Sequence, residues 1–571
     1  MRSMLTRMPR VIPIALIVTA SLTFAGRAQQ PPRAPLPLAA LKTTAEASDY
    51  KSTSTYDDVV KFMKTVDTAS PIVFYTAYGV TAEGRPMPLA IVGTGLKAAT
   101  PAAVKATGKL RVHIQGNIHA GEVEGKESAL ILLREFAMGQ HKDWLESMVF
   151  LITPIFNADG NEKFSLTNRP RQNGPINGMG TRANAQNLNI NRDFMKLDTP
   201  EGKAFVKLWN DYDPQVGFDL HTSDGSTHGY YLTYSPPLNP DTSSTIMTLM
   251  KDEWFPFVTK MMKTQHGWDA FYYGNVSTPG GRGAGRGSPA RGGAGAPTPE
   301  VVGAPAQPAQ MRAWATFEHV PRFHNNYVGL RNRFALLSEA YAYATFEDRI
   351  KATNYFLDAA LTFAHQNAAR LKKAVADADK ESIIGKAEAT RAQIKRGGTV
   401  DILMGEVEDE KNPLNGVVMN RRKDVVKVEP MIDMMWFEPS MTEEVPAAYY
   451  VPAWATRALD LLRAHGIQMR HENLSTNGLE QFQITNNTTR AANGSIDTGS
   501  HALRSVEGAW EHMPGFAGSP DYWTIPMNQP LARLAFYLLA PTSDDGLLAW
   551  NYLDDETLRL QSGTYPILRK K

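Results

Sequence analysis

Two kinds of hydrophobic periodicity alternate along the first part of the chain. Residues 72–78, 87–93 and 110–114 carry short apolar or alternating runs that are typical of β-strands. Residues 56–66 and 129–136 repeat apolar side chains at helical intervals. Strands that alternate with helices predict an α/β fold, in which a mixed or parallel sheet has helices on both faces.

The same alternation continues toward the middle of the chain. Strands are expected at 148–156, at 215–221 and at 334–337, where apolar runs end in polar turns. Residues 247–262 have the spacing of a helix, and 355–394 are rich enough in Ala, Leu, Lys and Arg to be largely helical. These elements extend the α/β pattern and close it with helices.

The pattern changes near residue 396. Short strand-like pieces such as TVDILMG, VVKVEPM and QFQIT follow, with one expected helix at 454–465. We therefore expect a mixed open sheet flanked by helices over 50–395, and an appended α+β or β-rich accessory domain over 396–571. The second segment has an ordinary size for a single domain.

Composition and charge limit the classes of partner. The chain has 571 residues, of which 43% are hydrophobic, enough for a large core and more than one domain. The formal net charge is only +2, so bulk electrostatics indicate neither nucleic acid nor an anionic membrane as a partner. The absence of cysteine excludes disulfides and thiolate metal ligands, so a metal site here requires His, Asp or Glu.

The N-terminus has the pattern of an export signal. Three arginines precede an apolar run over 11–25, and small residues up to Ala28 come before QQPP. This predicts a signal peptide over 1–28 and a secreted or periplasmic bacterial protein, with no stable membrane insertion after cleavage. An uncleaved anchor is the less favoured alternative, because the run is short for a bilayer. Residues 29–49 are expected to be a flexible lead-in.

A second low-complexity segment interrupts the first domain. Residues 278–308 are dominated by Gly, Pro, Ala and Arg, which predicts a disordered surface insertion. An arginine–glycine run can also bind RNA, but an exported chain of nearly neutral charge makes that reading less favoured.

Candidate metal ligands follow two of the predicted strands. The loop GNIHAGE after the 110–114 strand contains His119 and Glu122, and the 215–221 strand ends at His221. An H-x-x-E pair alone is also common in surface loops. Ligands of open α/β sheets bind beyond the carboxyl ends of the strands, where all three residues are expected. Two imidazoles and one carboxylate, with a fourth position open, are the composition of a catalytic zinc site.

At this point the sequence resembles the zinc carboxypeptidases of the carboxypeptidase A-like superfamily, over roughly 50–345. The H-x-x-E pair, a histidine 99 positions after Glu122, and NADG in place of the family's N-P-D-G turn carry the resemblance. It implies a zinc carboxypeptidase-like fold with one zinc ion per chain, held by His119, Glu122 and His221. Asp224 and His228 follow the strand and are expected to lie outside the ligand set.

The resemblance also implies a site for a substrate carboxylate. Asn191 and Arg192 match the family's Asn-Arg dipeptide, which grips the free C-terminal carboxylate of a peptide. A guanidinium does this with two parallel hydrogen bonds, whereas an ammonium cannot. An upstream arginine stabilises the oxyanion in the family, and both Arg169 and Arg171 lie in the matching loop. We favour Arg171, and the spacing does not choose between them.

The family's general base is a glutamate on a late strand of the sheet. Glu339 follows the 334–337 strand and is the residue we favour. Glu318 and Glu347 each stand in a T-F-E triplet and are alternatives. Tyr327 is a candidate for the family's substrate-capping tyrosine.

The leading hypothesis is a secreted zinc-dependent metallocarboxypeptidase that removes C-terminal residues from peptides. In it, a zinc-activated water attacks the scissile carbonyl, with Glu339 as general base. One alternative is a zinc-dependent deacylase or amidase acting on N-acyl amino acids or cell-wall peptides. Another is a non-catalytic binding protein with a vestigial site.

Overall fold

The structure is a computed structural model that describes residues 37–223, 225–277, 311–471, 478–513, 521–554 and 563–571. The predicted signal peptide over 1–28 lies outside these described residues, as do Asp224 and the predicted insertion over 278–308. Leu38–Lys571 forms one compact unit. None of the helices within the described ranges is long and apolar enough to cross a membrane.

An eight-stranded mixed sheet forms the centre of this unit, in the order β1-β2-β4-β3-β5-β10-β6-β7. The four central strands β4, β3, β5 and β10 are parallel neighbours, while β1 and β2 are antiparallel at one edge. The α/β fold with a mixed open sheet is thus confirmed. The strands are β1 (Val73–Val80), β2 (Pro86–Val92), β3 (Leu110–Gly116), β4 (Met148–Thr153), β5 (Val216–Ser223), β6 (Leu232–Ser235), β7 (Ala270–Tyr272) and β10 (Phe334–Tyr341).

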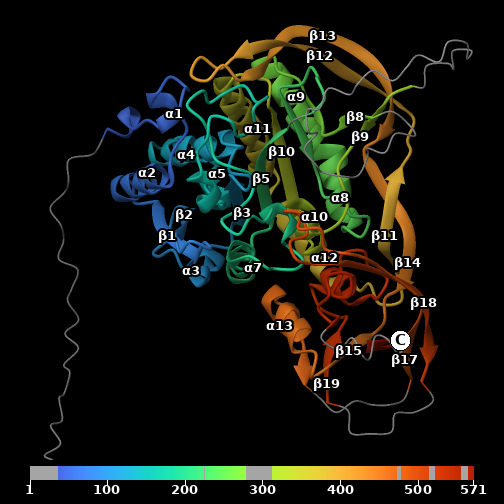
Figure 1. The fold of residues 1–571 in the computed structure, drawn as a ribbon. Helices are drawn as coiled ribbons and strands as arrows, with labels where there is room; N and C mark the ends of the chain where they lie inside the picture. The colour runs from blue at the N-terminus through green and yellow to red at the C-terminus, as the bar shows by residue number, and fades with distance from the viewer. Residues whose placement is uncertain (1–36, 224, 278–310, 472–477, 514–520, 555–562) are drawn as a thin grey trace, which may run out of the picture. The chain divides into compact units, whose positions relative to one another are not determined.

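Helices cover both faces of the sheet (Figure 1). Alternate strand residues point to opposite faces, so Leu89 and Ile91 join one core cluster while Ala90 and Val92 join another. The Ala90 face packs against α2 (Tyr56–Ala69), α4 (Glu124–Ala137), α9 (Phe255–His266), α11 (Phe346–Gln366) and α12 (Ala368–Lys380). The Leu89 face packs against α3 (Pro101–Ala106), α7 (Pro200–Tyr212) and α10 (His324–Leu330).

Short helices connect the main elements. They are η1 (Leu38–Ala40), α1 (Thr44–Ala47), α5 (Trp144–Ser147), α6 (Ala158–Asn161), η2 (Ile190–Arg192), α8 (Ser244–Thr248) and the π-helical η3 (Leu249–Trp254). The described part of the predicted lead-in over 29–49 contains η1 and α1, and its flexibility stays a prediction. Glu46 of α1 forms an ion pair with Arg134 of α4 at 2.7 Å, which ties this segment to the sheet layer.

The rest of the chain is rich in β-structure, as predicted. A long ribbon of β12 (Thr399–Lys411) and β13 (Val418–Met434) extends through β9 (Ala313–Ala315) to β8 (Asn275–Ser277). The helical expectation for 355–394 is wrong after Lys380, because β11 (Ala387–Lys395) pairs with the distant strand β14 (Trp436–Glu444). A six-stranded sheet contains β15 (Ala448–Pro452), β16 (Arg470–His471), β17 (Leu479–Arg490), β18 (Leu503–His512), β19 (Tyr522–Pro526) and β20 (Thr564–Lys570).

One hydrophobic core crosses the predicted boundary at 395–396. Helices α13 (Thr456–His465) and α14 (Ala532–Leu539) bury their apolar faces in the same cluster as α7 and α10. The division into two domains stays a prediction, and the C-terminal segment rests directly on the layer that carries the central sheet.

Close packing of α4 on β5 positions the residues at the end of the sheet. A Cβ atom on Gly125 of α4 would lie 2.5 Å from Cβ of Leu220 in β5. Gly125→Ala is therefore expected to lower the free energy of unfolding by about 1–3 kcal/mol, since rigid neighbours cannot move aside. Gly398→Ala is the matched control, because nothing lies within 4 Å of its Cβ position. Denaturant unfolding measures both, and equal stability of the two variants would contradict this packing argument.

Candidate active site

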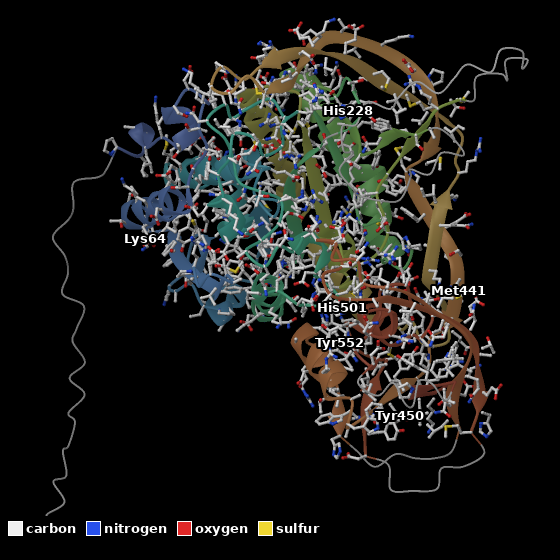
Figure 2. The ribbon with its side chains drawn as sticks, in the orientation of Figure 1. Lys64, His228, Met441, Tyr450, His501 and Tyr552 are labelled. Atoms are coloured by element: carbon white, nitrogen blue, oxygen red, sulfur yellow. The ribbon has the colours of Figure 1, made fainter. Side chains whose placement is uncertain are left out.

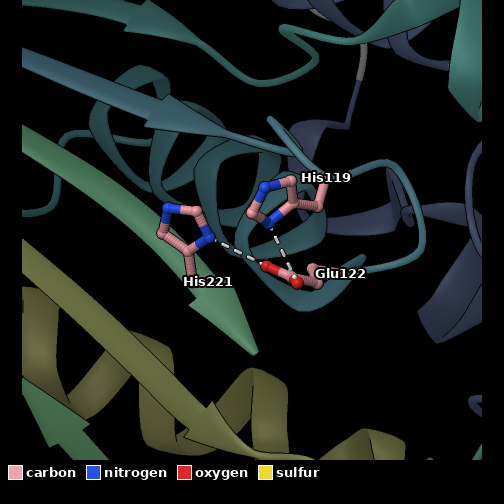
Figure 3. A group of neighbouring side chains, drawn as sticks. All are labelled: His119, Glu122 and His221. Atoms are coloured by element: carbon pink, nitrogen blue, oxygen red, sulfur yellow. Dashed lines mark hydrogen bonds and ion pairs between the residues drawn. The ribbon is translucent and has the colours of Figure 1, made fainter. Parts of the chain in front are cut away.

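The loop after β3 presents His119 and Glu122 toward the end of β5. Asn117 adopts a left-handed conformation with φ 63°, which asparagine tolerates better than most residues. Its side-chain amide donates to the carbonyl oxygens of Ala120 and Glu122, each at 3.2 Å. The tight loop thereby turns both candidate ligands toward His221 (Figure 3).

The donor atoms of the three residues converge. His119, Glu122 and His221 are buried, and their ligand atoms lie within 4.8 Å of one another. Nδ1 of His119 lies 3.1 Å from Oε1 of Glu122, and Nδ1 of His221 lies 2.9 Å from Oε2. Among the described residues, this is the group of His, Asp and Glu side chains with the spacing of a metal site. The structure thus brings together the three ligands expected from the sequence.

The outer hydrogen bonds fix the protons of both imidazoles. Nε2 of His221 lies 2.8 Å from the Asp219 carboxylate, which can only accept, so Nε2 carries the proton. Nε2 of His119 lies 3.0 Å from Oδ1 of Asn189, and the backbone N–H of Asn191 donates to the same oxygen at 3.1 Å. Since that oxygen is an acceptor, His119 also carries its proton on Nε2. The Nδ1 lone pair of His119 therefore faces the Glu122 carboxylate.

Nδ1 of His119, Nδ1 of His221 and the Glu122 carboxylate converge, and all three can accept a metal ion once His221 loses its Nδ1 proton. Two imidazole nitrogens and a carboxylate are a donor set that zinc accepts. Burial lowers the pKa of His119 to about 3, and Arg182 acts in the same direction, so His119 is neutral. Burial also lowers the pKa of His221, but Asp219 and Glu122 outweigh it and hold the pKa well above its ordinary value. A bound cation would displace the proton on Nδ1 of His221, which otherwise donates to Glu122.

A neighbouring arginine binds the Glu122 carboxylate. Burial raises the pKa of Glu122, but the opposing effects of His119 and Arg169 hold it well below its ordinary value. Nη1 of Arg169 donates to Oε1 of Glu122 at 2.9 Å. A Cβ atom on Gly121 would lie 2.6 Å from Cδ of Arg169. The glycine between the two loop ligands thus makes room for this arginine.

Glu339 lies beside His221 in the sheet. The two residues are in register on the parallel strands β10 and β5, so their side chains point to the same face. Strand β10 continues to Tyr341, so Glu339 lies within the strand instead of after it. The alternative Glu347 is on α11 and pairs with Lys351 at 2.7 Å. The role of Glu339 as general base remains a prediction. Its register with His221 is consistent with that role.

The alternative Glu318 lines a separate pocket. This pocket has a volume of about 390 Å³ and lies between the segment before α10 and the C-terminal part of the chain. The side chains that line it are Glu318, His319, Val320, Arg322, Ala392, Gln393, Ile394, Phe437, Arg490 and Asp544.

Two further candidates are part of the core and not of the site. Tyr327, the expected cap, is fully buried with its hydroxyl 2.9 Å from Nδ1 of His465. His228 is buried against Tyr341, with ring centroids 4.1 Å apart. Both side chains thus have packing partners away from the metal group.

The structure places Arg171 outside the metal group. Its side chain is 61% exposed, donates to Asn420 at 3.2 Å and lies 3.6 Å from Asp409, both on the β12–β13 ribbon. A turn closed by the Gln172 N–H on the Arg169 carbonyl separates it from Arg169, which does reach the site. The preference for Arg171 over Arg169 has no support in this geometry.

Arg182 reaches the site instead and was not singled out from the sequence. Its Nη1 lies 3.3 Å from Nδ1 of His119 and 3.8 Å from Oε1 of Glu122, and its side chain is 33% exposed. It belongs to the same Arg- and Asn-rich stretch, but no spacing rule distinguishes it there. Asp219 was also missed, although it lies two residues before His221 in a strand and so on the same face.

Arg192 is a buried cation next to the metal group. It is 6% exposed, its guanidinium lies 3.5 Å above the ring of Phe323, and Nη1 donates to the Asn191 carbonyl at 2.6 Å. Burial lowers its pKa to about 10, although the Asp497 carboxylate acts in the opposite direction. In the part of the chain that the structure describes, no carboxylate forms an ion pair with Arg192. Such a cation favours an anionic ligand.

Comparisons with known proteins find similarity to zinc carboxypeptidases. Residues 59–267 match the family model described as zinc carboxypeptidase. Carboxypeptidase 2 of Trichophyton rubrum is 32% identical over 117 residues, which are 20% of this chain and 18% of that protein. A probable carboxypeptidase 2 of Arthroderma benhamiae is 32% identical over 126 residues, 21% of this chain and 20% of that protein. The chain thus covers about a fifth of the length of these relatives.

Solved structures matched by the chain include two bacterial metallo-carboxypeptidases. The one from Burkholderia cenocepacia is 18% identical with a TM-score of 0.37, over 55% of this chain and 70% of that chain. The one from Pseudomonas aeruginosa is in complex with (2-guanidinoethylmercapto)succinic acid. It is 14% identical with a TM-score of 0.36, over 56% of this chain and 70% of that chain. Residues 59–267 are thus similar to the zinc carboxypeptidase family, over less than half of the chain.

Proposed function

We propose that this protein is a zinc-dependent metallocarboxypeptidase that releases C-terminal residues from peptides. The observation that supports it most is the buried Arg192 without a carboxylate partner among the described residues. Its neighbour Asn191 lies within 3.4 Å of His221, measured from Nδ2 to Nε2, so a carboxylate held here lies next to the metal ligands. This is the arrangement needed to cut the bond that precedes a C-terminal residue.

In this proposal His119, Glu122 and His221 hold one zinc ion per chain. A zinc ion bound there supplies the positive charge that polarises the scissile carbonyl and activates water near neutral pH. The guanidinium of Arg192 holds the terminal carboxylate by paired hydrogen bonds, with Asn191 beside it. Burial strengthens that attraction, because little water competes for the guanidinium.

Glu339 serves as the general base in this proposal. It takes a proton from the attacking water and then passes it to the nitrogen of the leaving residue. Its place in register with His221 puts the carboxylate on the face where the metal ligands lie. Proton transfer requires this proximity, either directly or through one water.

Arg182 is the cation that we assign to the developing oxyanion. Arg182→Met is expected to lower kcat by about 100- to 1,000-fold, the usual cost of removing one such donor. Arg171→Met is the matched control, because that side chain is 61% exposed on the β12–β13 ribbon. Steady-state kinetics on one peptide measure both. A loss with Arg171→Met alone would return the role to Arg171, and equal losses in the two variants would contradict a specific role for Arg182.

A pair of peptides tests the proposed reaction. One peptide ends in a free carboxylate, and its twin carries a C-terminal amide; mass spectrometry follows the release of the last residue. We expect the free acid to be cut and the amide to lose at least about 100-fold in kcat/KM, because the bonds to Arg192 are missing. Preferred cleavage of N-acyl amino acids over peptides would support the deacylase alternative, and no turnover of either would support a binding protein.

We also propose export through the N-terminal segment over 1–28. The supporting observation is the run of arginines followed by an apolar stretch in the sequence. N-terminal sequencing of the mature protein from the periplasm or medium of a bacterial host tests it. A mature protein that still begins at Met1 would contradict the predicted cleavage.

A further inference from the structure

A short segment of the C-terminal part of the chain docks beside the metal loop. The carbonyl of Ile496 accepts from the backbone N–H of Asn189 at 2.7 Å. The carboxylate of Asp497 accepts from Nδ2 of the same asparagine, also at 2.7 Å. Residues 495–501 therefore touch the one side chain that bonds the outer nitrogen of His119.

Other contacts fasten the same segment. Nε2 of His501 lies 3.1 Å from Oδ2 of Asp198. The hydroxyl of Tyr552 donates to the carbonyl of Lys196, and its ring stacks on that of His501 with centroids 6.2 Å apart. Figure 2 labels His501 and Tyr552 close together, next to the layer that carries α7. These contacts hold the segment in place without touching a metal ligand.

The hydrogen bonds of Asn189 leave one orientation for its amide. An ionised carboxylate only accepts, so Asp497 must face the NH₂ group. The backbone N–H of Asn191 only donates, so it must face the oxygen, at 3.1 Å. The two constraints come from opposite ends of the amide and agree. The oxygen that remains toward His119 therefore accepts from Nε2–H at 3.0 Å.

We propose that Asp497 is a positioning residue of the metal centre. It holds the amide of Asn189 so that His119 keeps its proton on Nε2 and offers the Nδ1 lone pair to a metal ion. The inference rests on the proposed zinc site and extends it into the C-terminal part of the chain. Through Asp497, the C-terminal part of the chain contributes to the metal site.

The charge of Asp497 strengthens the effect of the neutral amide. A hydrogen bond to an ionised acceptor is stronger than one between neutral groups, and bonds in a chain polarise one another. Asn189 thus presents a more basic oxygen to His119 than it would alone. Groups that orient a metal-bound histidine typically contribute about 10- to 100-fold to metal affinity when they are its direct partner.

Zinc affinity of the full chain, measured by competition with a chelating dye, tests the proposal. Asp497→Ala is expected to weaken zinc binding by about tenfold, the low end for such partners because Asp497 acts through one intermediate residue. Asp497→Asn keeps an acceptor oxygen and should lose less than about threefold by the same reasoning. In an Asn189→Ala background, Asp497→Ala should cause no further loss, because the relay is already broken.

His501→Ala is the matched control, since it removes another contact of the same segment but does not bond Asn189. It should change zinc affinity by less than about twofold, as additivity between separate sites predicts. Thermal unfolding of the metal-free variants separates loss of the relay from loss of the fold. If Asp497→Ala and His501→Ala weaken zinc binding equally, or if Asp497→Ala still weakens it without Asn189, the inference is wrong. A wild-type chain that binds no zinc would overturn the inference together with the proposed function; intact zinc binding and hydrolysis in Asp497→Ala would overturn the inference alone.

Discussion

Glu339→Gln is expected to lower kcat for the release of C-terminal residues by about 100- to 10,000-fold, the range in which general base catalysis contributes. Glutamine keeps the size of the side chain in β10 but cannot accept a proton at neutral pH. The three metal ligands are unchanged, so zinc content should remain that of the wild type. Steady-state kinetics and elemental analysis on the same preparation measure the two quantities separately.

Two other glutamates serve as controls for this variant. Glu347→Gln changes a residue on α11 that pairs with Lys351, and it should leave kcat within about twofold, as expected of exposed surface changes. If Glu339→Gln retains most of its activity, the base lies elsewhere, and Glu318→Gln is the next variant to measure. Joint loss of zinc and activity would instead mean that Glu339 supports the ligands.

His221→Ala is expected to weaken zinc binding by more than about 100-fold. Loss of a metal ligand lowers metal affinity more than loss of a residue that hydrogen-bonds a ligand, which lowers it by about 10- to 100-fold. The change also removes the imidazole between Asp219 and Glu122, which leaves two buried carboxylates facing each other across a gap. Hydrolysis should fall to the background of the uncatalysed reaction. Zinc competition binding and peptide turnover measure both effects.

An exposed histidine provides the control for His221→Ala. His471 lies in β16, in a different sheet from the strands that carry the metal group, with a side chain that is 55% exposed. His471→Ala should keep wild-type zinc affinity and turnover. Full zinc binding by His221→Ala would show that the metal, if bound, is held by other residues.

Local pattern predicted the strands of the sheet and, with the family resemblance, the three residues that the structure brings together as a group able to hold a metal ion. The strands before the H-x-x-E loop and before His221 have short apolar runs that only a buried strand explains, and both runs end in polar turns. Because β3 and β5 are parallel neighbours, their carboxyl ends meet at one edge. Glu339 was chosen from the family resemblance and from its place after a predicted strand. It lies on β10, the next parallel strand, and its role as general base stays a prediction.

The residues that support the ligands could not be found from local pattern. Arg169, Arg171 and Arg182 share one irregular loop, and the direction of each side chain depends on turns that composition does not define. Asp497 reaches Asn189 across 308 positions of sequence, through docking of the C-terminal part of the chain. β11 was expected to be helical because its alanine content favours a helix, but pairing with β14 decides its structure.

The most direct test of the central claim is zinc content and C-terminal hydrolysis on one purified preparation, before and after chelation and after zinc is restored. The account predicts about one zinc per chain, as a mononuclear catalytic site holds. It also predicts that release of the last residue from a free-acid peptide is lost on chelation and regained with zinc. Unchanged release by the chelated protein, or stoichiometric zinc without any release, would contradict it.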